Sequence, residues 1–143
     1  MSGQLDADIR YPLAEHAADR LHSRSGVSFD AINLEAVRAG EIDSDDLTID
    51  RETLLLQAKV AETGGYRQLG ENLRRAAELV EIPNDRLLRI YEALRPRRAG
   101  YRELLALADE LESRHAAPAN ARFVRQAAEA YRAGGMLKEE EPR

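Results

Sequence analysis

The chain has no cysteine and no tryptophan, and only seven of its 143 residues are aromatic. Without cysteine it cannot form a disulfide, a cysteine-ligated zinc or iron–sulfur site, or a thiolate nucleophile. So few aromatic residues argue against a stacking surface for single-stranded nucleic acid. Long apolar runs are missing too, since the longest is Leu104–Ala108 and a membrane helix needs roughly 20 apolar residues. We expect a cytoplasmic protein that neither spans a membrane nor binds nucleic acid.

Charge is distributed unevenly along the chain, whose net charge is -5. Residues 1–50 carry 11 acidic and 4 basic side chains, whereas residues 51–138 carry 12 acidic and 16 basic ones. Nineteen of the 21 basic residues are arginine. Arginine makes planar, bidentate contacts, so one interpretation is a basic face for an acidic partner. The alternative is solvated helix faces, because arginine and glutamate alternate at helical spacings.

From residue 50 onward, apolar residues recur every three or four positions, which predicts successive amphipathic helices. Asp50 is a candidate N-cap, and the glycine pairs 64–65 and 134–135 are candidate stops. Pro83 separates two helices, with Asn84 as the next predicted cap. We expect main helices at 50–63, 66–80, 84–94, 101–114 and 118–134. Their predicted inner faces include Leu54, Leu55, Ala58 and Ala61; Leu69, Leu73, Ala76, Ala77 and Val80; Leu87, Leu88, Ile90, Tyr91 and Leu94; Leu104, Leu105, Ala108 and Leu111; and Phe123, Ala127 and Tyr131.

The N-terminal third lacks this periodicity. Residue 11 precedes a proline and is therefore driven toward an extended conformation. The sequence predicts an all-α fold of about five main helices, arranged as an extended N-terminal arm (1–32), a compact helical domain (33–135) and a disordered acidic tail (136–143). Short helices are expected at 33–39 and 44–47. The arm cannot build a core of its own, so it must lie along its own helices or along another chain.

Candidate catalytic patterns are weak. Glu112 and His115 share a helix face, but a di-metal centre needs two such pairs, and a stand-alone metal enzyme would depend on this one. Asp43, Asp45 and Asp46 lack the glycine and the closing glutamate of a calcium loop. Residues 65–70 begin like a phosphate loop, yet glutamate and asparagine follow where lysine and serine or threonine are required. We therefore predict no catalytic, cofactor-binding or metal-binding residue on this chain.

Several segments together closely resemble the small, or gamma, subunit of adenosylcobalamin-dependent propanediol and glycerol dehydratases. The resemblance covers nearly the whole chain, from residue 11 to residue 131. The matching segments are residues 11–14, 52–54, 57–58, 75–79, 82–86, 90–96, 103–114, 123–125, 127–128 and 131. Residues 15–32 match weakly. Gly100 stands where the family places a serine or threonine helix cap.

The resemblance implies a hydro-lyase that converts a 1,2-diol or glycerol to an aldehyde and water by a radical mechanism. The family assembles large, medium and small subunits, usually as a dimer of heterotrimers. Adenosylcobalamin lies on the other subunits, and the small subunit docks on the large one without a catalytic residue. The isolated chain is then expected to be inactive. The resemblance leaves the preferred substrate open, and any microcompartment address would come from other subunits.

Nine residues are candidates for the subunit interface. An extended anchor, a basic junction between helices and two amphipathic tyrosines each suit a protein interface. They are Tyr11, Pro12, Leu13, Tyr91, Arg95, Pro96, Arg97, Arg98 and Tyr131. Tyr91 and Tyr131 could instead fill the chain's own core, and the arginines could be solvated. A free-standing helical adaptor is the alternative function that the composition allows.

Overall fold

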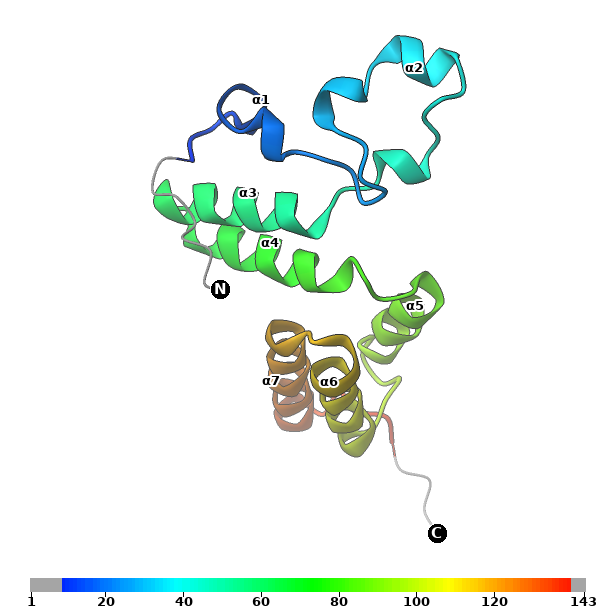
Figure 1. Ribbon diagram of the computed structural model, residues 1–143. Helices are drawn as coiled ribbons and strands as arrows, with labels where there is room; N and C mark the ends of the chain where they lie inside the picture. The colour runs from blue at the N-terminus through cyan, green and yellow to red at the C-terminus, as the bar shows by residue number, and fades with distance from the viewer. Residues whose placement is uncertain (1–8, 140–143) are drawn as a thin grey trace. The chain divides into compact units, whose positions relative to one another are not determined.

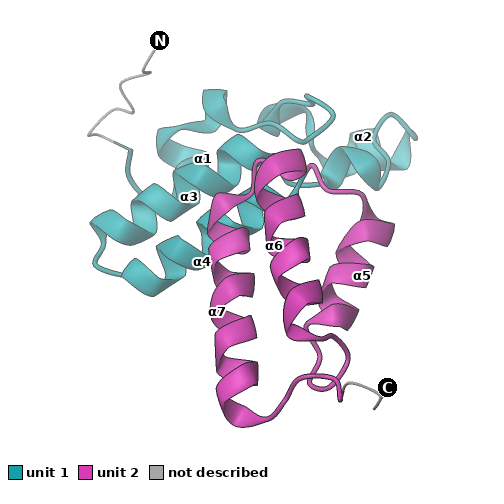
Figure 2. Ribbon diagram, turned by 90° about the horizontal axis from the view of Figure 1, so that it is seen from below, with its two compact units in different colours: residues 1–80 teal, residues 81–143 magenta. Residues whose placement is uncertain are grey.

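The computed structural model describes residues 9–139 and divides the chain into two compact units (Figures 1 and 2). Unit 1 ends at Val80, and unit 2 begins at Glu81. The described residues contain seven α helices and no extended strand, so the all-α prediction is confirmed. The helices are α1 (Leu13–His16), α2 (Leu34–Arg38), α3 (Arg51–Thr63), α4 (Arg67–Leu79), α5 (Asn84–Ala93), α6 (Tyr101–His115) and α7 (Pro118–Gly134).

Unit 1 is built on the hairpin of α3 and α4, which pack along their lengths. Ala58 of α3 is fully buried, and Gly70 of α4 is buried beside it. A Cβ atom at Gly70 would lie 3.1 Å from the Ala58 carbonyl oxygen and 2.5 Å from Cγ of Glu62. The absence of a side chain at position 70 therefore lets the two backbones approach closely.

The N-terminal segment packs on the side of α3 that carries Leu56. Leu13, Ala17, Leu21 and Leu56 form one buried cluster, with Ile9 and Val60 partly buried against it. Pro12 is extended (φ -76°, ψ 142°) and immediately precedes α1. The arm thus lies along its own helix, one of the two arrangements the sequence allowed. Its 13–20 stretch folds into α1 and a 3-10 helix rather than remaining extended throughout.

Residues 22–50 form a long loop that is interrupted by α2 and two short 3-10 helices and has little core of its own. Backbone hydrogen bonds tie Ser23 to Val27 and Arg24 to Thr48, and the Ser25 hydroxyl donates to Asp46 at 2.6 Å. Ile42 is buried, whereas five other large apolar side chains are exposed. Polar contacts therefore contribute much of what holds this loop in place. The exposed residues are Phe29, Leu34, Val37, Leu47 and Ile49.

Unit 2 is organised by α6 and α7, which pack closely on each other. The contact consists of leucines facing alanines: Leu104 and Leu111 are buried, as are Ala121 and Ala128. Gly100 has no side chain with which to cap α6, but Glu103 accepts a hydrogen bond from its backbone N–H at 2.6 Å. This is the glutamate half of a capping box; the other half, which a serine or threonine hydroxyl at position 100 would form with the N–H of Glu103, is missing.

The five main helices begin and end within about one residue of the positions that the sequence predicts. Asp50 caps α3 by accepting hydrogen bonds from the backbone N–H groups of Glu52 and Thr53. Gly135 ends α7 in the left-handed region (φ 65°). Asn84 was predicted to be a cap but is the first residue of α5, after Pro83.

The inner faces required more correction than the boundaries. On α3 the buried leucines are 54 and 56, and Leu55 is only half-buried, because the arm covers the Leu56 side. On α7 the buried apolar residues are Ala121, Val124 and Ala128, while Phe123 is 46% exposed. Small side chains at this face allow α6 to approach closely. Leu69 and Leu88 were expected inside, but each is more than half exposed.

The predicted tail, 136–143, falls partly outside the described residues. Within them, the Met136 carbonyl accepts a hydrogen bond from Arg97 N–H, and Lys138 N–H donates to the Ala99 carbonyl. The end of the described chain is thus bonded to the loop between α5 and α6. No helix within residues 9–139 combines the length and apolar character needed to cross a bilayer.

The corrected face of α3 gives a direct test by a matched pair of substitutions. Leu56→Ala opens a cavity in the arm–α3 cluster and should lower the free energy of unfolding by about 2–5 kcal/mol. Leu55→Ala, at the neighbouring half-buried position, should cost about 1 kcal/mol. Urea unfolding followed by circular dichroism measures both. Equal losses would contradict the assignment of Leu56 to the core.

Candidate docking surface

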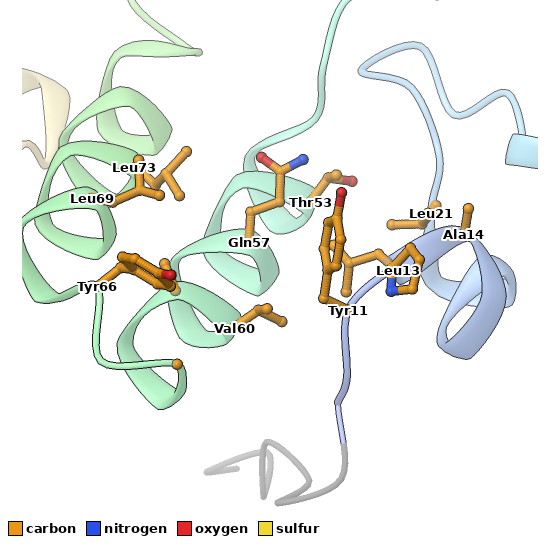
Figure 3. A pocket seen from close by; sticks show the side chains of 13 residues that line it. Tyr11, Leu13, Ala14, Leu21, Thr53, Gln57, Val60, Tyr66, Leu69 and Leu73 are labelled. Atoms are coloured by element: carbon orange, nitrogen blue, oxygen red, sulfur yellow. The ribbon is translucent and has the colours of Figure 1, made fainter.

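A hollow within unit 1 has a volume of about 730 Å³ (Figure 3). Its floor is α3, one wall is the N-terminal segment, and the opposite wall is α4. None of its lining residues is charged. We call this the unit 1 hollow; it is lined by Tyr11, Pro12, Leu13, Ala14, Leu21, Thr53, Gln57, Val60, Ala61, Gly64, Tyr66, Leu69 and Leu73.

Helical spacing places the floor and the α4 wall. Thr53, Gln57, Val60 and Gly64 follow one another at intervals of four, three and four residues, so they share one face of α3. Residues 66, 69 and 73 likewise share the face of α4 toward the hollow. The other sides of α3 carry Leu56 against the arm and Ala58 against α4. The hollow lies over the face of α3 between these two contacts, and Val60 at its edge also packs against the arm's cluster.

The rim of the hollow exposes large side chains. Tyr11 is 79% exposed, Tyr66 68% and Leu69 51%. Figure 3 shows Tyr11 across the hollow from Leu69 and Leu73, with the Gln57 amide between them. Apolar groups held open to water in this way are typical of binding surfaces rather than of a closed core.

An ion pair fastens α3 to α4 beside the hollow. Arg74 donates two hydrogen bonds to the Glu62 carboxylate, at 2.7 and 2.8 Å. These bonds lower the pKa of Glu62 below its ordinary value of 4.5, against the opposing effect of partial burial. The pair spans the close approach at Gly70, so it helps to fix the spacing between the floor and the α4 wall.

Three of the nine predicted interface residues lie at this hollow. Tyr11, Pro12 and Leu13 form part of its N-terminal wall. Leu13 is buried in the cluster with Leu56, so it anchors the segment, while Tyr11 remains exposed at the rim. Of the predicted anchor residues, Leu13 is therefore buried within this chain, whereas Tyr11 is exposed and free to contact a partner.

The other six predicted residues belong to unit 2. Tyr91 is 55% exposed on α5. Glu92 lies near two arginines, at 3.1 Å from Arg95 and 3.3 Å from Arg98. The remaining residues are Pro96, which is exposed, and Arg97, which takes a positive φ of 67°.

Tyr131 contributes to the packing of unit 2 itself. It is half-buried, and its hydroxyl donates a hydrogen bond to the Leu94 carbonyl at 2.5 Å. This contact joins α7 to the end of α5. Tyr131 thus contributes to the packing of its own chain, which the sequence allowed as the alternative to a role at the subunit interface.

Two polar clusters could suggest a metal site, and both have other roles. His22, Asp50 and Glu52 lie close together, but Asp50 caps α3, and Arg20 lies 3.5 Å from Glu52. Elsewhere, Glu112 accepts a hydrogen bond from Arg125. Its expected companion, His115, lies 3.7 Å from Glu110 instead. Helix capping and ion pairing account for these side chains.

Sequence reasoning missed most of the floor and the α4 wall. Leu69 and Leu73 were assigned to a buried stripe, and Tyr66 was treated only as the start of a helix. A signal was present in the sequence: uncharged residues at 53, 57, 60 and 64 make a second face on α3 in addition to the buried one. Periodicity alone does not say which of two such faces a neighbour covers.

The fold and the hollow together define a class of protein. It is an all-helical protein with an open, uncharged surface of the kind that packs against an apolar surface of another protein. The dehydratase small subunit family matches residues 7–138. A propanediol dehydratase small subunit of Salmonella typhimurium is 44% identical over 121 residues, which cover 85% of this chain and 70% of that protein. One from Citrobacter freundii is 43% identical with the same coverage. The chain belongs to the dehydratase small subunit family, and the resemblance seen in the sequence is confirmed.

The Glu62–Arg74 pair predicts an acid-sensitive contribution to stability. Because the pKa of Glu62 is lowered in the folded state, the contribution is present above the unfolded value and is lost as pH falls through the folded one. Glu62→Gln should therefore destabilise the chain near pH 7 and progressively less below pH 4.5. Thermal unfolding from pH 7 to pH 3 measures this.

The control is Glu71→Gln, which removes an exposed partner lying 3.7 Å from Arg67 on α4. It should change stability little at any pH. A constant difference between Glu62→Gln and the unchanged chain across this range would contradict the assigned pair.

Proposed function

We propose that this chain is the small subunit of a cobalamin-dependent diol dehydratase and that it docks on the catalytic large subunit and stabilises it. The enzyme converts a 1,2-diol or glycerol to an aldehyde and water in a cytoplasmic assembly of large, medium and small subunits, doubled into a dimer of heterotrimers. The observation that carries the proposal is the family match over residues 7–138, supported by relatives named propanediol dehydratase small subunits.

A structural role suits the described surface of this chain. The unit 1 hollow is lined by uncharged residues only, with no imidazole or carboxylate for acid–base work or metal ligation. The lining residues do not suit adenosylcobalamin either, since they offer no histidine as an axial ligand and no charged group for a phosphate. We therefore place the cofactor and the reacting groups on the other subunits.

Docking of this chain would support turnover by making the catalytic subunit more rigid. A radical enzyme must hold its reacting groups in place and exclude water, and supporting the outside of the catalytic subunit limits its breathing motions. Such a subunit needs an apolar surface to bury and no chemistry of its own. The unit 1 hollow, with its exposed Tyr11 and Tyr66, provides that surface.

Co-expression with candidate large and medium subunits tests the proposal. Native mass spectrometry should detect all three chains in one complex, and cobalamin-dependent aldehyde formation should fall when the small subunit is omitted. The small subunit alone should be inactive. A chain that stays apart, beside large and medium subunits that are fully active without it, would overturn the proposal and favour a free-standing adaptor.

The basic junction after α5 gives a second prediction. Replacing Arg95 and Arg98 by alanine should weaken assembly with the large subunit by roughly 5- to 30-fold, because arginine is a frequent energetic anchor at interfaces. The fold should persist, since both arginines are exposed and exposed ion pairs such as those with Glu92 add little stability.

Arg122→Ala, at an exposed position of α7, is the control for loss of one positive charge. Both variants are compared with the unchanged chain by titration against the large–medium complex. Unchanged affinity and activity in the double variant would remove the junction from the interface.

A further inference from the structure

We propose that Thr53 and Gln57, on the floor of the unit 1 hollow, recognise a hydrogen-bonding group on an otherwise apolar, uncharged segment of the large dehydratase subunit. The inference rests on the proposed function and specifies what the docking surface selects. The recognised group is an amide, from the backbone or from a side chain, because hydroxyl and carboxamide groups both donate and accept hydrogen bonds.

The first observation is the state of the Thr53 hydroxyl. Its Oγ1 atom is buried and has no hydrogen-bond partner within the part of the chain that the structure describes. Buried polar atoms of folded proteins nearly always have a partner, so an exception indicates a missing one. Thr53 is also one of the residues that line the hollow.

The position of Thr53 in α3 explains why the helix does not supply that partner. A threonine inside a helix commonly donates to the carbonyl four residues earlier, as Thr63 does to Lys59 at 2.9 Å. For Thr53 the corresponding residue is Ile49, which precedes the Asp50 cap and lies outside the helix. No hydrogen bond to the Asp50 carbonyl, three residues earlier, is formed either, so the hydroxyl stays unpaired within the described chain.

The second observation is the chemistry of the surrounding wall. None of the thirteen lining residues is charged, and most are aliphatic or aromatic. An ionised group would lose its hydration here without gaining an opposite charge, so an uncharged occupant is favoured. The absence of a basic residue also disfavours an anionic lipid headgroup. Exposed tyrosines at 11 and 66 are typical anchors of a protein interface.

The chain's own first residues are a poorer match to the hollow. Residues 1–8 precede Ile9, which packs at the edge of the buried cluster. Their large apolar side chains are Met1 and Leu5, and they also carry two aspartates. Carboxylates do not suit the uncharged walls. A segment of the large subunit that carries several apolar residues fits the volume of about 730 Å³ better.

The test compares the free chain with the complex. Thr53→Val keeps the shape of the side chain but removes the hydroxyl. The thermal midpoint of the free chain should stay the same or rise, because an unpaired buried polar group is lost. The dissociation constant for the large–medium complex should rise about tenfold, because the partner's amide loses its hydrogen bond. Gln57→Leu should also weaken binding.

Two control variants isolate the hydroxyl. Thr53→Ser keeps it and should bind as the unchanged chain does. Thr63→Val makes the same chemical change at an exposed position of α3 outside the hollow, so it should leave affinity unchanged. If Thr53→Val keeps or raises the thermal midpoint of the free chain but weakens binding to the large–medium complex, the hydroxyl forms its hydrogen bond with the partner.

The remaining outcomes overturn the inference in distinguishable ways. If the complex forms and Thr53→Val binds normally, the hollow does not recognise an amide, while the proposed function stands. If the unchanged chain never binds the large–medium complex, the proposed function fails and the inferred partner fails with it. If removal of residues 1–8 tightens binding, the hollow is occupied by this chain's own first residues. If Thr53→Val dissociates a homodimer but leaves affinity for the large–medium complex unchanged, the hollow binds a second copy of this chain.

Discussion

The structure of unit 1 depends on the packing of α3 between two neighbours. On one side Leu56 packs in the arm's apolar cluster, and on another Ala58 meets α4 where Gly70 allows close approach. A helix held in this way has a fixed orientation, so its third face, with Thr53, Gln57 and Val60, is presented in a defined position. The unit 1 hollow is thus a consequence of the packing that folds the unit.

The helix positions were largely predictable because caps, glycines and prolines act locally. Asp50, through its carboxylate, and Pro83 and Gly135, through their backbone conformations, mark boundaries whatever packs nearby. Burial was less predictable, because it depends on which neighbour covers a face. Leu56 is buried by the arm, a segment that has no apolar periodicity of its own. Phe123 is 46% exposed, and the smaller residues Ala121, Val124 and Ala128 are the buried ones on α7. Such choices are made by tertiary contacts.

The same distinction applies to the site. Tyr11 and Leu13 could be predicted as an anchor because an extended segment before a helix must lie against something. Thr53 and Gln57 could not, since their importance comes from the opposite wall supplied by α4 and from a hydroxyl left without a partner. The family relation gave the function a context that charge and periodicity did not provide.

The central claim is that the unit 1 hollow faces the large subunit in the assembled enzyme. The most direct measurement is photo-crosslinking in the three-subunit complex, with a photoreactive phenylalanine analogue in place of Tyr66 at the rim. The account predicts a crosslink to the large subunit that is absent when the same analogue replaces Phe29, in the loop of residues 22–50. A fully assembled complex in which position 66 forms no crosslink to the large subunit, while position 91 of α5 does, would contradict it.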